Sequence, residues 1–258
     1  MSTEALAKRL HEARVKREEV EIPTDLWPTN EDMVIGAQEE VLRLGGLTPG
    51  GWKAGPPPLG LSAQVGAARL PAEWTKESPA KVVAPNEPFY VEAEFVVRLG
   101  RDLPAADAPY DRDAVAAAAD AVAPGIELVW RRIADRVAKD TGILHMADSG
   151  GHTAFVLGEW RENWQSLDLT KHPVRLLING KEIKAGHSGL TMDGHPFNVV
   201  AGLANREIRL GRSLKAGMWV TTGSCTGLEI VEPGDEVVAE YGELGKVEVT
   251  IESESESA

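Results

Sequence analysis

Cysteine is almost absent from this chain, since Cys225 is its one cysteine among 258 residues. No intrachain disulfide can form, and the cysteine count indicates no particular redox compartment. Cys225 lies in no recognisable nucleophile motif, so we expect a small buried thiol. The sequence also lacks a phosphate-binding loop, a dinucleotide fingerprint and a Gly-x-Ser-x-Gly elbow. Its histidines show no zinc-binding spacing such as His-x-x-x-His.

Long apolar runs and an excess of positive charge are missing as well. No stretch approaches the ~20 apolar residues of a membrane-spanning helix, and residues 1–21 lack the apolar segment of a signal peptide. The formal net charge is -13, which argues against nucleic acid as a partner because phosphate binding needs a basic surface. Hydrophobic residues make up 43% of the chain and charged residues 26%, as in ordinary soluble proteins. We therefore expect a soluble, cytoplasmic protein without membrane contact.

The N-terminal part is predicted to be helical. Residues 4–20 carry apolar side chains at helical spacing. A second helix is predicted over 31–44, because Asn30 is a suitable N-cap and a Gly-Gly pair ends the pattern. Residues 48–66 are rich in glycine and proline, so we predict a loop there. These patterns separate a helical N-terminal region from the rest of the chain.

The predicted division has three parts. Residues 1–47 form the helical region, residues 48–251 form a β-rich domain, and residues 252–258 form an acidic tail that we expect to fray.

The β-rich domain is predicted to contain two helices among many strands. The alanine-rich residues 111–123 predict a helix that ends at Pro124-Gly125. A second helix is predicted from Pro196 to about Arg209. The dipeptide Asn179-Gly180 favours a type I′ turn in a hairpin of residues 174–185. Other strands are predicted over residues 91–99, 126–129, 153–157, 218–222, 228–231, 236–241 and 246–251.

The segment 91–97 carries the most informative pattern. Side chains alternate along a strand, so Glu92 and Glu94 point to one face with Cα atoms roughly 7 Å apart, while apolar residues take the other face. Two like charges held this close repel each other unless a cation, a proton or water relieves them. A hard ion such as Mg²⁺ or Mn²⁺ suits an all-oxygen site. A Glu-x-Glu face is also common on solvated strands, and the pattern alone leaves both interpretations open.

Other segments carry further candidate residues. Lys53, in a glycine-bounded turn, could pair with an anionic substrate group or shuttle a proton, or be an ordinary surface lysine. Glu127 lies in an apolar run, where an unpaired charge is costly, so it could be a third metal ligand or an outward residue of a half-exposed strand. Asp148 could be a pocket residue or a turn former. The hydroxyls and glycines of residues 221–227 could bind a carboxylate or form a tight turn.

In order, five stretches resemble the fumarylacetoacetate hydrolase superfamily over about residues 30–251, especially its 2-oxopent-4-enoate hydratases and 4-oxalocrotonate decarboxylases. The stretches are Gly51-Trp52-Lys53-Ala54-Gly55; Val91-Glu92-Ala93-Glu94 with Gly100-Arg101-Asp102-Leu103; Ile126-Glu127-Leu128-Val129 with Arg132-Ile133; Ala147-Asp148 with Phe155-Val156-Leu157-Gly158; and Gly194-His195-Pro196 through Ala201, with Leu203-Ala204-Asn205, Thr222-Gly223-Ser224 and Thr226-Gly227. Five matches in the right order argue against a chance resemblance.

The resemblance implies a fold and a set of site residues. The fold would be a mixed α/β (α+β) one, with a β-roll or barrel-like core and a helical N-terminal region, usually oligomeric. Metal ligands would fall on Glu92, Glu94 and Glu127, with Mg²⁺ or Mn²⁺ as the cofactor. Substrate-binding and catalytic roles would fall on Lys53 and Asp148, and further substrate contacts on Thr222 and Ser224.

The chain departs from the family pattern at three places that shape the substrate end of the pocket. Pro56-Pro57-Pro58 follows the lysine-bearing turn, where the family often has Leu-Thr-Ser. Trp130-Arg131 stands where Asp-Ser is common. Ser149-Gly150-Gly151-His152 follows the aspartate, where a small polar run with asparagine is usual.

The implied activity is that of a metal-dependent hydratase in aromatic-compound catabolism. It would protonate a 2-hydroxy-2,4-dienoate to a 2-oxo-enoate and add water to give a 4-hydroxy-2-oxo acid, with the ion acting as a Lewis acid. Lys53 would orient the substrate carboxylate or relay a proton, and Asp148 would help to position the substrate.

Three alternatives remain open on the sequence. A 4-oxalocrotonate-type decarboxylase would use the same enolate stabilisation. A C–C bond hydrolase would need a positioned base, commonly a His–Glu dyad, and the surroundings of His11-Glu12 do not resemble one. A non-catalytic subunit would bind a metal or keto acid without turnover. We expect a homo-oligomer, which could also associate with a partner decarboxylase or hydratase.

Overall fold

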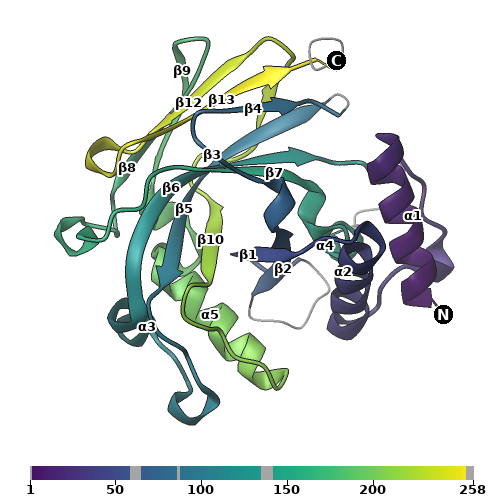
Figure 1. Cartoon of the computed structure of the whole chain (residues 1–258), viewed down its shortest axis with the longest axis horizontal. Coiled ribbons are helices and arrows are strands. Elements are labelled where there is room, and N and C mark those ends of the chain that lie inside the picture. Colours follow the sequence, from purple (N-terminus) through teal and green to yellow (C-terminus); the bar gives the residue numbers. More distant parts are fainter. Residues whose placement is uncertain (1, 59–64, 86–87, 135–141, 254–258) are drawn as a thin grey trace.

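The chain folds into two β-sheets flanked by helices, as Figure 1 shows for a computed structural model whose described residues are 2–58, 65–85, 88–134 and 142–253. The predicted mixed α+β fold is confirmed, although the described strands form two open sheets and close no barrel. None of the described helices is long and apolar enough to cross a membrane.

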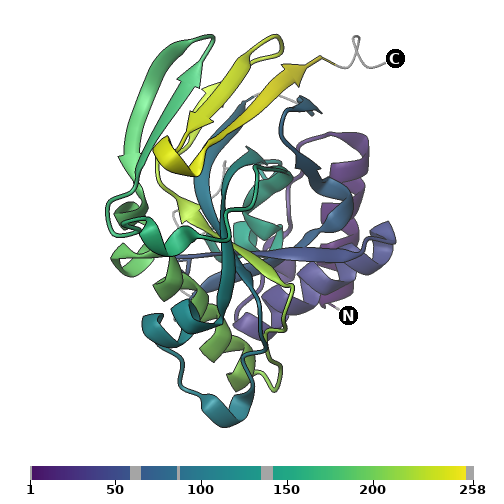
Figure 2. The same cartoon turned by 60° about the vertical axis from the view of Figure 1, so that its left-hand side comes forward.

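The two N-terminal helices are α1 (Ser2–Lys16) and α2 (Glu31–Gly45). Both were predicted, although α1 ends four residues earlier than the pattern suggests. Asn30 caps α2 by accepting a hydrogen bond from the Met33 N–H at 3.0 Å. Together with α4 (Gly142–Ala147) these helices bury a separate apolar cluster, at a distance from the second sheet (Figure 2). The cluster includes Leu6, Leu10, Ala37, Val41 and Leu144.

The first sheet has eight strands in the order β2-β1-β10-β5-β6-β7-β3, with β11 beside β5. The central strands β5 and β6 are long and antiparallel. The strands are β1 (Pro49–Gly55), β2 (Gly66–Pro71), β3 (Thr75–Glu77), β5 (Phe89–Leu99), β6 (Ala119–Trp130), β7 (His152–Leu157), β10 (Trp219–Ser224) and β11 (Glu229–Val231).

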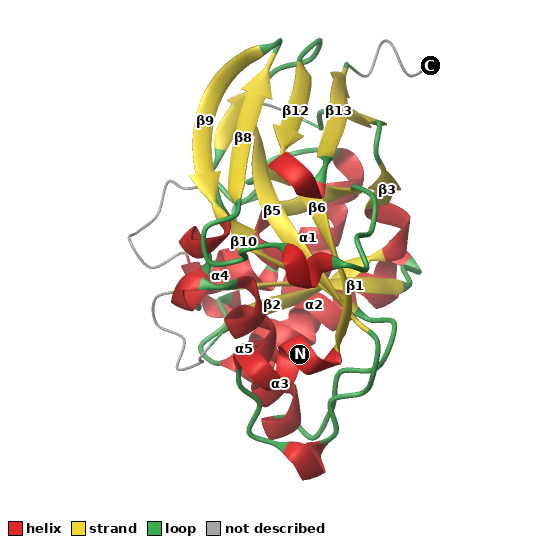
Figure 3. Ribbon diagram, turned by 90° about the vertical axis from the view of Figure 1, so that its left-hand side faces the viewer, coloured by secondary structure: helices red, strands yellow, loops and turns green. Residues whose placement is uncertain are grey.

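The second sheet has five strands in the order β4-β13-β12-β8-β9 and stands at one end of the molecule (Figure 3). Its strands are β4 (Ala80–Val83), β8 (Pro173–Ile178), β9 (Lys181–His187), β12 (Glu236–Glu240) and β13 (Lys246–Glu252). The predicted hairpin is confirmed, because Asn179 and Gly180 join β8 to β9 with φ values of 52° and 74°. In the predicted frayed tail, residue 252 belongs to β13, and residues 254–258 lie outside the described residues.

The predicted helix over residues 111–123 is wrong in its second half. Helix α3 covers Arg112–Ala118, and β6 begins at Ala119 and continues through Pro124 and Gly125. Ten of the twelve residues of β6 are buried between β5 and β7. This burial in the sheet outweighs the helix propensity of alanine, which is a weak local preference.

The predicted loop over residues 48–66 is also wrong in part, because Pro49–Gly55 forms β1. Strand β1 lies between β2 and β10. Gly51 fits a crowded position in the sheet, since a Cβ there would lie 2.3 Å from the Trp219 ring. Glycine content therefore reflects close packing here rather than a loop.

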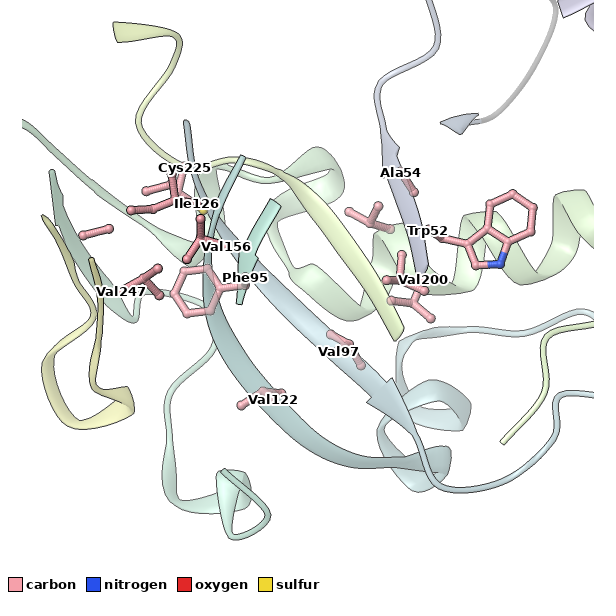
Figure 4. Packing of buried hydrophobic residues seen from close by; sticks show 14 of the residues in the cluster. Trp52, Ala54, Phe95, Val97, Val122, Ile126, Val156, Val200, Cys225 and Val247 are labelled. Atoms are coloured by element: carbon pink, nitrogen blue, oxygen red, sulfur yellow. The ribbon is translucent and has the colours of Figure 1, made fainter. Parts of the chain in front are cut away.

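Helix α5 has the predicted bounds, Pro196–Arg209. It covers one face of the first sheet. It packs against β1, β5 and β10, where Val200 and Trp52 belong to the same buried cluster. Phe95 of β5 points into this cluster between the two sheets (Figure 4). Because strand side chains alternate, Glu92 and Glu94 project from the opposite face of β5.

Short 3-10 helices complete the fold and lie between the main elements. They cover Thr24–Leu26, Ala72–Trp74, Ala105–Asp107, Ser149–Gly151, Trp164–Ser166, Ser188–Leu190, Met192–Gly194 and Gly242–Leu244.

Candidate metal and substrate site

Three carboxylates meet on one face of the paired strands β5 and β6. Alternation along β5 places Glu92 and Glu94 on one face, as predicted, and the antiparallel register places Glu127 of β6 directly opposite Glu92. One oxygen from each of the three carboxylates lies within 4.8 Å of the other two. The solvated-surface interpretation fails for Glu94 and Glu127, which are 1% and 0% exposed. These three side chains could therefore hold a metal ion.

The environment makes the charges of these carboxylates unequal. Burial, followed by repulsion from Glu127, raises the pKa of Glu92 and raises the pKa of Glu94 well above its usual value. Burial acts in the same direction on Glu127, but Lys53 and His152 outweigh it and lower the pKa of Glu127 to about 2. Glu127 is thus ionised at neutral pH, while its two neighbours need a cation or a proton beside them.

Lys53 of β1 supplies the positive charge beside this cluster. Its Nζ donates a hydrogen bond to Glu127 Oε1 at 2.6 Å, and its side chain is 17% exposed. Lys53 is therefore not an ordinary surface lysine. Burial alone would lower its pKa, but the carboxylates, Glu127 first, outweigh burial and raise it. The ammonium group stays charged next to the carboxylates.

The β10 segment holds Glu94 in place. The Thr221 hydroxyl donates to Glu94 Oε2, and the Gly223 N–H donates to the same oxygen at 3.0 Å. The Thr222 hydroxyl donates to the Phe95 carbonyl at 2.9 Å. Ser224 Oγ accepts the Gly227 N–H at 2.8 Å, as a tight turn requires. The Ser224 side chain also forms a hydrogen bond with Glu92, so it helps to hold the second carboxylate of β5.

A pocket of about 300 Å³ opens onto the cluster and contains five of the seven predicted site residues in its lining. Glu127 and Asp148 are not among the lining residues. The lining comes from β1, β2, β5, α4, β10 and the turns after β9. It consists of Lys53, Ala54, Gly55, Pro56, Gly66, Glu92, Glu94, Met146, Leu190, Thr191, Met192, Thr222, Gly223 and Ser224.

Asp148 is buried beside the pocket in an ion pair. Both of its carboxylate oxygens lie 2.5 Å from Arg132 Nη1, and Arg14 Nη2 lies 3.7 Å from Oδ1. The following turn reaches Lys53, since a Cβ on Gly150 would lie 3.0 Å from Lys53 Nζ. Asp148 is thus connected to the pocket through this turn, and its substrate contact stays a prediction.

His152 is a site residue that the sequence did not predict. It is completely buried, and its Nδ1 lies 2.9 Å from Glu127 Oε1. Burial lowers the pKa of His152 in spite of Glu127, so we expect a neutral ring that donates from Nδ1. The sequence offered one signal, a histidine in place of the usual small polar run after Asp148. Its contact with Glu127 depends on the pairing of β6 with β7.

The donor set fits a hard divalent cation. Glu127 uses Oε1 for Lys53 and His152, whereas its buried Oε2 has no hydrogen-bond partner among the described residues. A buried carboxylate oxygen without a partner is unfavourable. Mg²⁺ and similar ions bind carboxylate oxygens, so an ion beside Glu127 Oε2, Glu92 and Glu94 would satisfy all three groups.

The chain belongs to the fumarylacetoacetate (FAA) hydrolase family. The profile of the family described as "Fumarylacetoacetate (FAA) hydrolase C-terminal" matches residues 5–252. This finding confirms the resemblance predicted from the motifs.

Several curated relatives are hydratases or decarboxylases. A 2-keto-4-pentenoate hydratase of Burkholderia vietnamiensis (strain G4 / LMG 22486) is 31% identical over 233 residues, which cover 89% of this chain and 82% of the relative. A 2-keto-4-pentenoate hydratase of Paraburkholderia xenovorans (strain LB400) is 34% identical, over 63% of this chain and 59% of the relative. A 4-oxalocrotonate decarboxylase of Pseudomonas putida is 33% identical, over 52% and 49%. The chain therefore matches about half to three fifths of the last two relatives.

A solved structure confirms the fold. The 4-oxalocrotonate decarboxylase from Pseudomonas putida G7, complexed with magnesium and adipate, superposes with a TM-score of 0.85 at 24% identity. The match covers 96% of this chain and 97% of that protein. The same protein has also been solved with calcium and acetate.

Proposed function

We propose that this protein is a metal-dependent hydratase that acts on a 2-hydroxy-2,4-dienoate and its 2-oxo-enoate tautomer. The product is a 4-hydroxy-2-oxo acid. The observation that carries the proposal is the cluster of Glu92, Glu94 and Glu127 beside a pocket of about 300 Å³ with Lys53 in its wall. The relative that matches 89% of this chain, a 2-keto-4-pentenoate hydratase, supports the same activity.

The three carboxylates are the proposed ligands of Mg²⁺ or Mn²⁺. A divalent cation bound there supplies Lewis acidity that stabilises an enolate oxygen of a 2-oxo acid. Glu127 presents its Oε2, which has no hydrogen-bond partner in the described part of the chain, and Glu94 is oriented by Thr221 and Gly223. Their fixed geometry means that little reorganisation is needed when a charged ligand enters.

Lys53 is proposed to bind the substrate carboxylate and to relay protons. One hydrogen bond of its ammonium group goes to Glu127, which leaves two N–H donors. The carboxylate cluster keeps the ammonium group charged. Thr222 and Ser224, which line the pocket, are proposed to border the substrate. Asp148 is proposed as a positioning residue that fixes, through Arg132, the turn beside Lys53.

Decarboxylation of a 4-oxalocrotonate-type 2-oxo acid is the second candidate. The decarboxylase relative at 33% identity favours it. The same enolate stabilisation would serve, with loss of CO₂ in place of water addition. We also propose that the protein is cytoplasmic and acts in aromatic catabolism. We propose that it forms a homo-oligomer and can associate with a partner enzyme. Size-exclusion chromatography with light scattering tests the assembly.

The direct experiment is turnover of freshly generated 2-hydroxypenta-2,4-dienoate, followed by loss of its ultraviolet absorbance. We expect activity with Mg²⁺ or Mn²⁺, a 4-hydroxy-2-oxo product and no activity with EDTA. CO₂ release from 4-oxalocrotonate, without hydration of the dienoate, would identify the decarboxylase instead. Unchanged hydration after removal of all metal would contradict the proposed mechanism.

A further inference from the structure

One wall of the pocket is formed by long apolar side chains. Met146 comes from α4, while Leu190 and Met192 come from the two turns that follow β9. Leu190 is 57% exposed, which is unusual for a large aliphatic residue in the described part of this chain. An exposed apolar side chain at a pocket is typical of a ligand-binding surface.

The charges of the pocket are confined to its other wall. Lys53 is the one cation among the described lining residues, and Glu127 already binds it at 2.6 Å. Next to Leu190, the Thr191 hydroxyl donates to the Ser188 carbonyl at 2.8 Å. Within the described lining, a second carboxylate on a ligand would therefore face apolar side chains and the acidic cluster. Burying an unpaired charge in such surroundings is costly.

We propose that Leu190 and Met192, together with Met146, bind the uncharged tail of a 2-oxo acid and make the pocket selective for monocarboxylates. This inference rests on the proposed function, in which the 2-oxo carboxylate end of the substrate lies at Lys53 and the acidic cluster. The two methionine side chains are flexible and polarisable, so they can adapt to tails of different shape. Leu190 acts as a specificity-determining residue at the mouth of the pocket.

Binding of a second ligand carboxylate by Arg131 is the alternative that the experiment must distinguish from an apolar tail site. Arg131 directly follows β6 and lies over the Tyr90 ring, 5.9 Å from the ring centroid, outside the pocket lining. A dicarboxylate that extended out of the pocket toward Arg131 would have its second charge paired there. Such a ligand would make Arg131, rather than Leu190, the residue that selects the tail.

Calorimetric titration of the Mg²⁺-loaded protein with saturated 2-oxo acids tests the proposal without turnover. The probes are pyruvate, 2-oxobutyrate, 2-oxopentanoate and 2-oxohexanoate, with 2-oxoadipate as the dicarboxylate of matched chain length. We expect the affinity to rise by up to about fourfold with each added methylene. 2-Oxohexanoate should bind at least about tenfold more tightly than 2-oxoadipate.

Variants assign the effect to the apolar wall. Leu190→Ala should reduce the gain per methylene to less than about twofold, so that affinity falls more for 2-oxohexanoate than for pyruvate. Val15→Ala, which shortens an aliphatic side chain that is 67% exposed on α1, is the matched control and should keep the wild-type increments.

Three results would overturn the proposal in distinguishable ways. Tighter binding of 2-oxoadipate, lost in Arg131→Gln, would assign the tail to Arg131. Equal increments in the wild type and in Leu190→Ala would remove the apolar wall from substrate selection while leaving the hydratase proposal intact. Failure of every 2-oxo acid to bind would contradict the proposed function itself, and the tail selectivity with it.

Discussion

Two buried clusters of charged residues lie side by side in this protein, and their balance of charge differs. The acidic cluster contains three carboxylates, Glu92, Glu94 and Glu127, against one ammonium group. The arginine cluster, Arg14 and Arg132 with Asp148, contains two guanidinium groups against one carboxylate. The two clusters are linked through His152, whose ring contacts Glu127 and whose carbonyl accepts from Arg14 Nη1 at 2.7 Å.

The arginine cluster compensates part of its extra charge with protein groups, although the Nε atoms of Arg14 and Arg132 are buried without a hydrogen-bond partner among the described residues. Arg132 Nη2 donates to the His152 carbonyl at 3.3 Å, and the Arg14 guanidinium lies 4.0 Å from the centroid of the Trp74 ring. Burial, followed by repulsion from Arg132, lowers the pKa of Arg14 to about 9, so the group is still charged at neutral pH. A cation–π contact and the shared His152 carbonyl thus stabilise a charge excess inside the fold.

The acidic cluster also has protein partners, but its three carboxylates face one ammonium group, and Glu92 and Glu94 line a pocket. Glu127 Oε2 lacks a hydrogen-bond partner among the described residues, and burial, followed by repulsion from Glu127, raises the pKa of Glu94. The comparison teaches that burial of charge alone does not mark a functional site. The informative feature is an excess of charge that borders a pocket, as at Glu92 and Glu94, because a bound ligand can reach and satisfy it.

The largest expected effect is on activity. Glu94→Gln removes an anionic ligand but keeps the side chain shape, so we expect kcat/KM for the dienoate to fall by about 10²–10³-fold or more with the fold preserved. Circular dichroism and thermal unfolding check the fold. Glu162→Gln, at a side chain that is 82% exposed, is the control and should keep full activity. Near-normal kcat/KM in Glu94→Gln would contradict a role of this cluster in the reaction.

A substitution in the arginine cluster should change the free energy of unfolding. Asp148→Asn leaves Arg132 and Arg14 buried without a full counter-charge, so we expect a loss of about 3–5 kcal/mol in the free energy of unfolding. Urea denaturation measures it. Asp120→Asn, whose carboxylate is 43% exposed beside Arg98, should cost less than about 1 kcal/mol. Equal costs for the two variants would show that the Asp148 ion pair is not structural.

Metal addition should stabilise the acidic cluster selectively. At a Mg²⁺ concentration of about 100 times Kd, binding to the folded state contributes about 2.7 kcal/mol, which is about 5–10 °C in Tm for a chain of this size. The shift should disappear in Glu94→Gln and persist in Glu162→Gln. An equal shift in both variants would place the bound ion elsewhere.

The smallest effect concerns pH in the metal-free protein. Burial raises the pKa of Glu94 in the folded state, so folding favours its protonated form. The contribution of Glu94 is therefore full below its ordinary pKa and is lost as the pH rises through the raised pKa. Urea denaturation of metal-stripped protein from about pH 4 to about pH 8 should show Glu94→Gln gaining stability relative to wild type. A constant difference would contradict the raised pKa.

The sequence predicted features that depend on local pattern. Alternation along residues 91–97 placed Glu92 and Glu94 on one face, and Asn179-Gly180 predicted the hairpin turn. Features that depend on strand pairing could not be predicted from the sequence. Alanine-rich residues became the start of β6 because the sheet buries them, and the His152–Glu127 contact exists because β7 pairs with β6.

The most direct test of the central claim is Mn²⁺ binding, measured by calorimetry on the wild type, Glu94→Gln, Glu127→Gln and Glu162→Gln. We predict one ion per chain in the wild type and in Glu162→Gln, with affinity reduced by about 100-fold or more in the other two variants. Wild-type affinity in both Glu94→Gln and Glu127→Gln would contradict the assignment of the acidic cluster as the metal site.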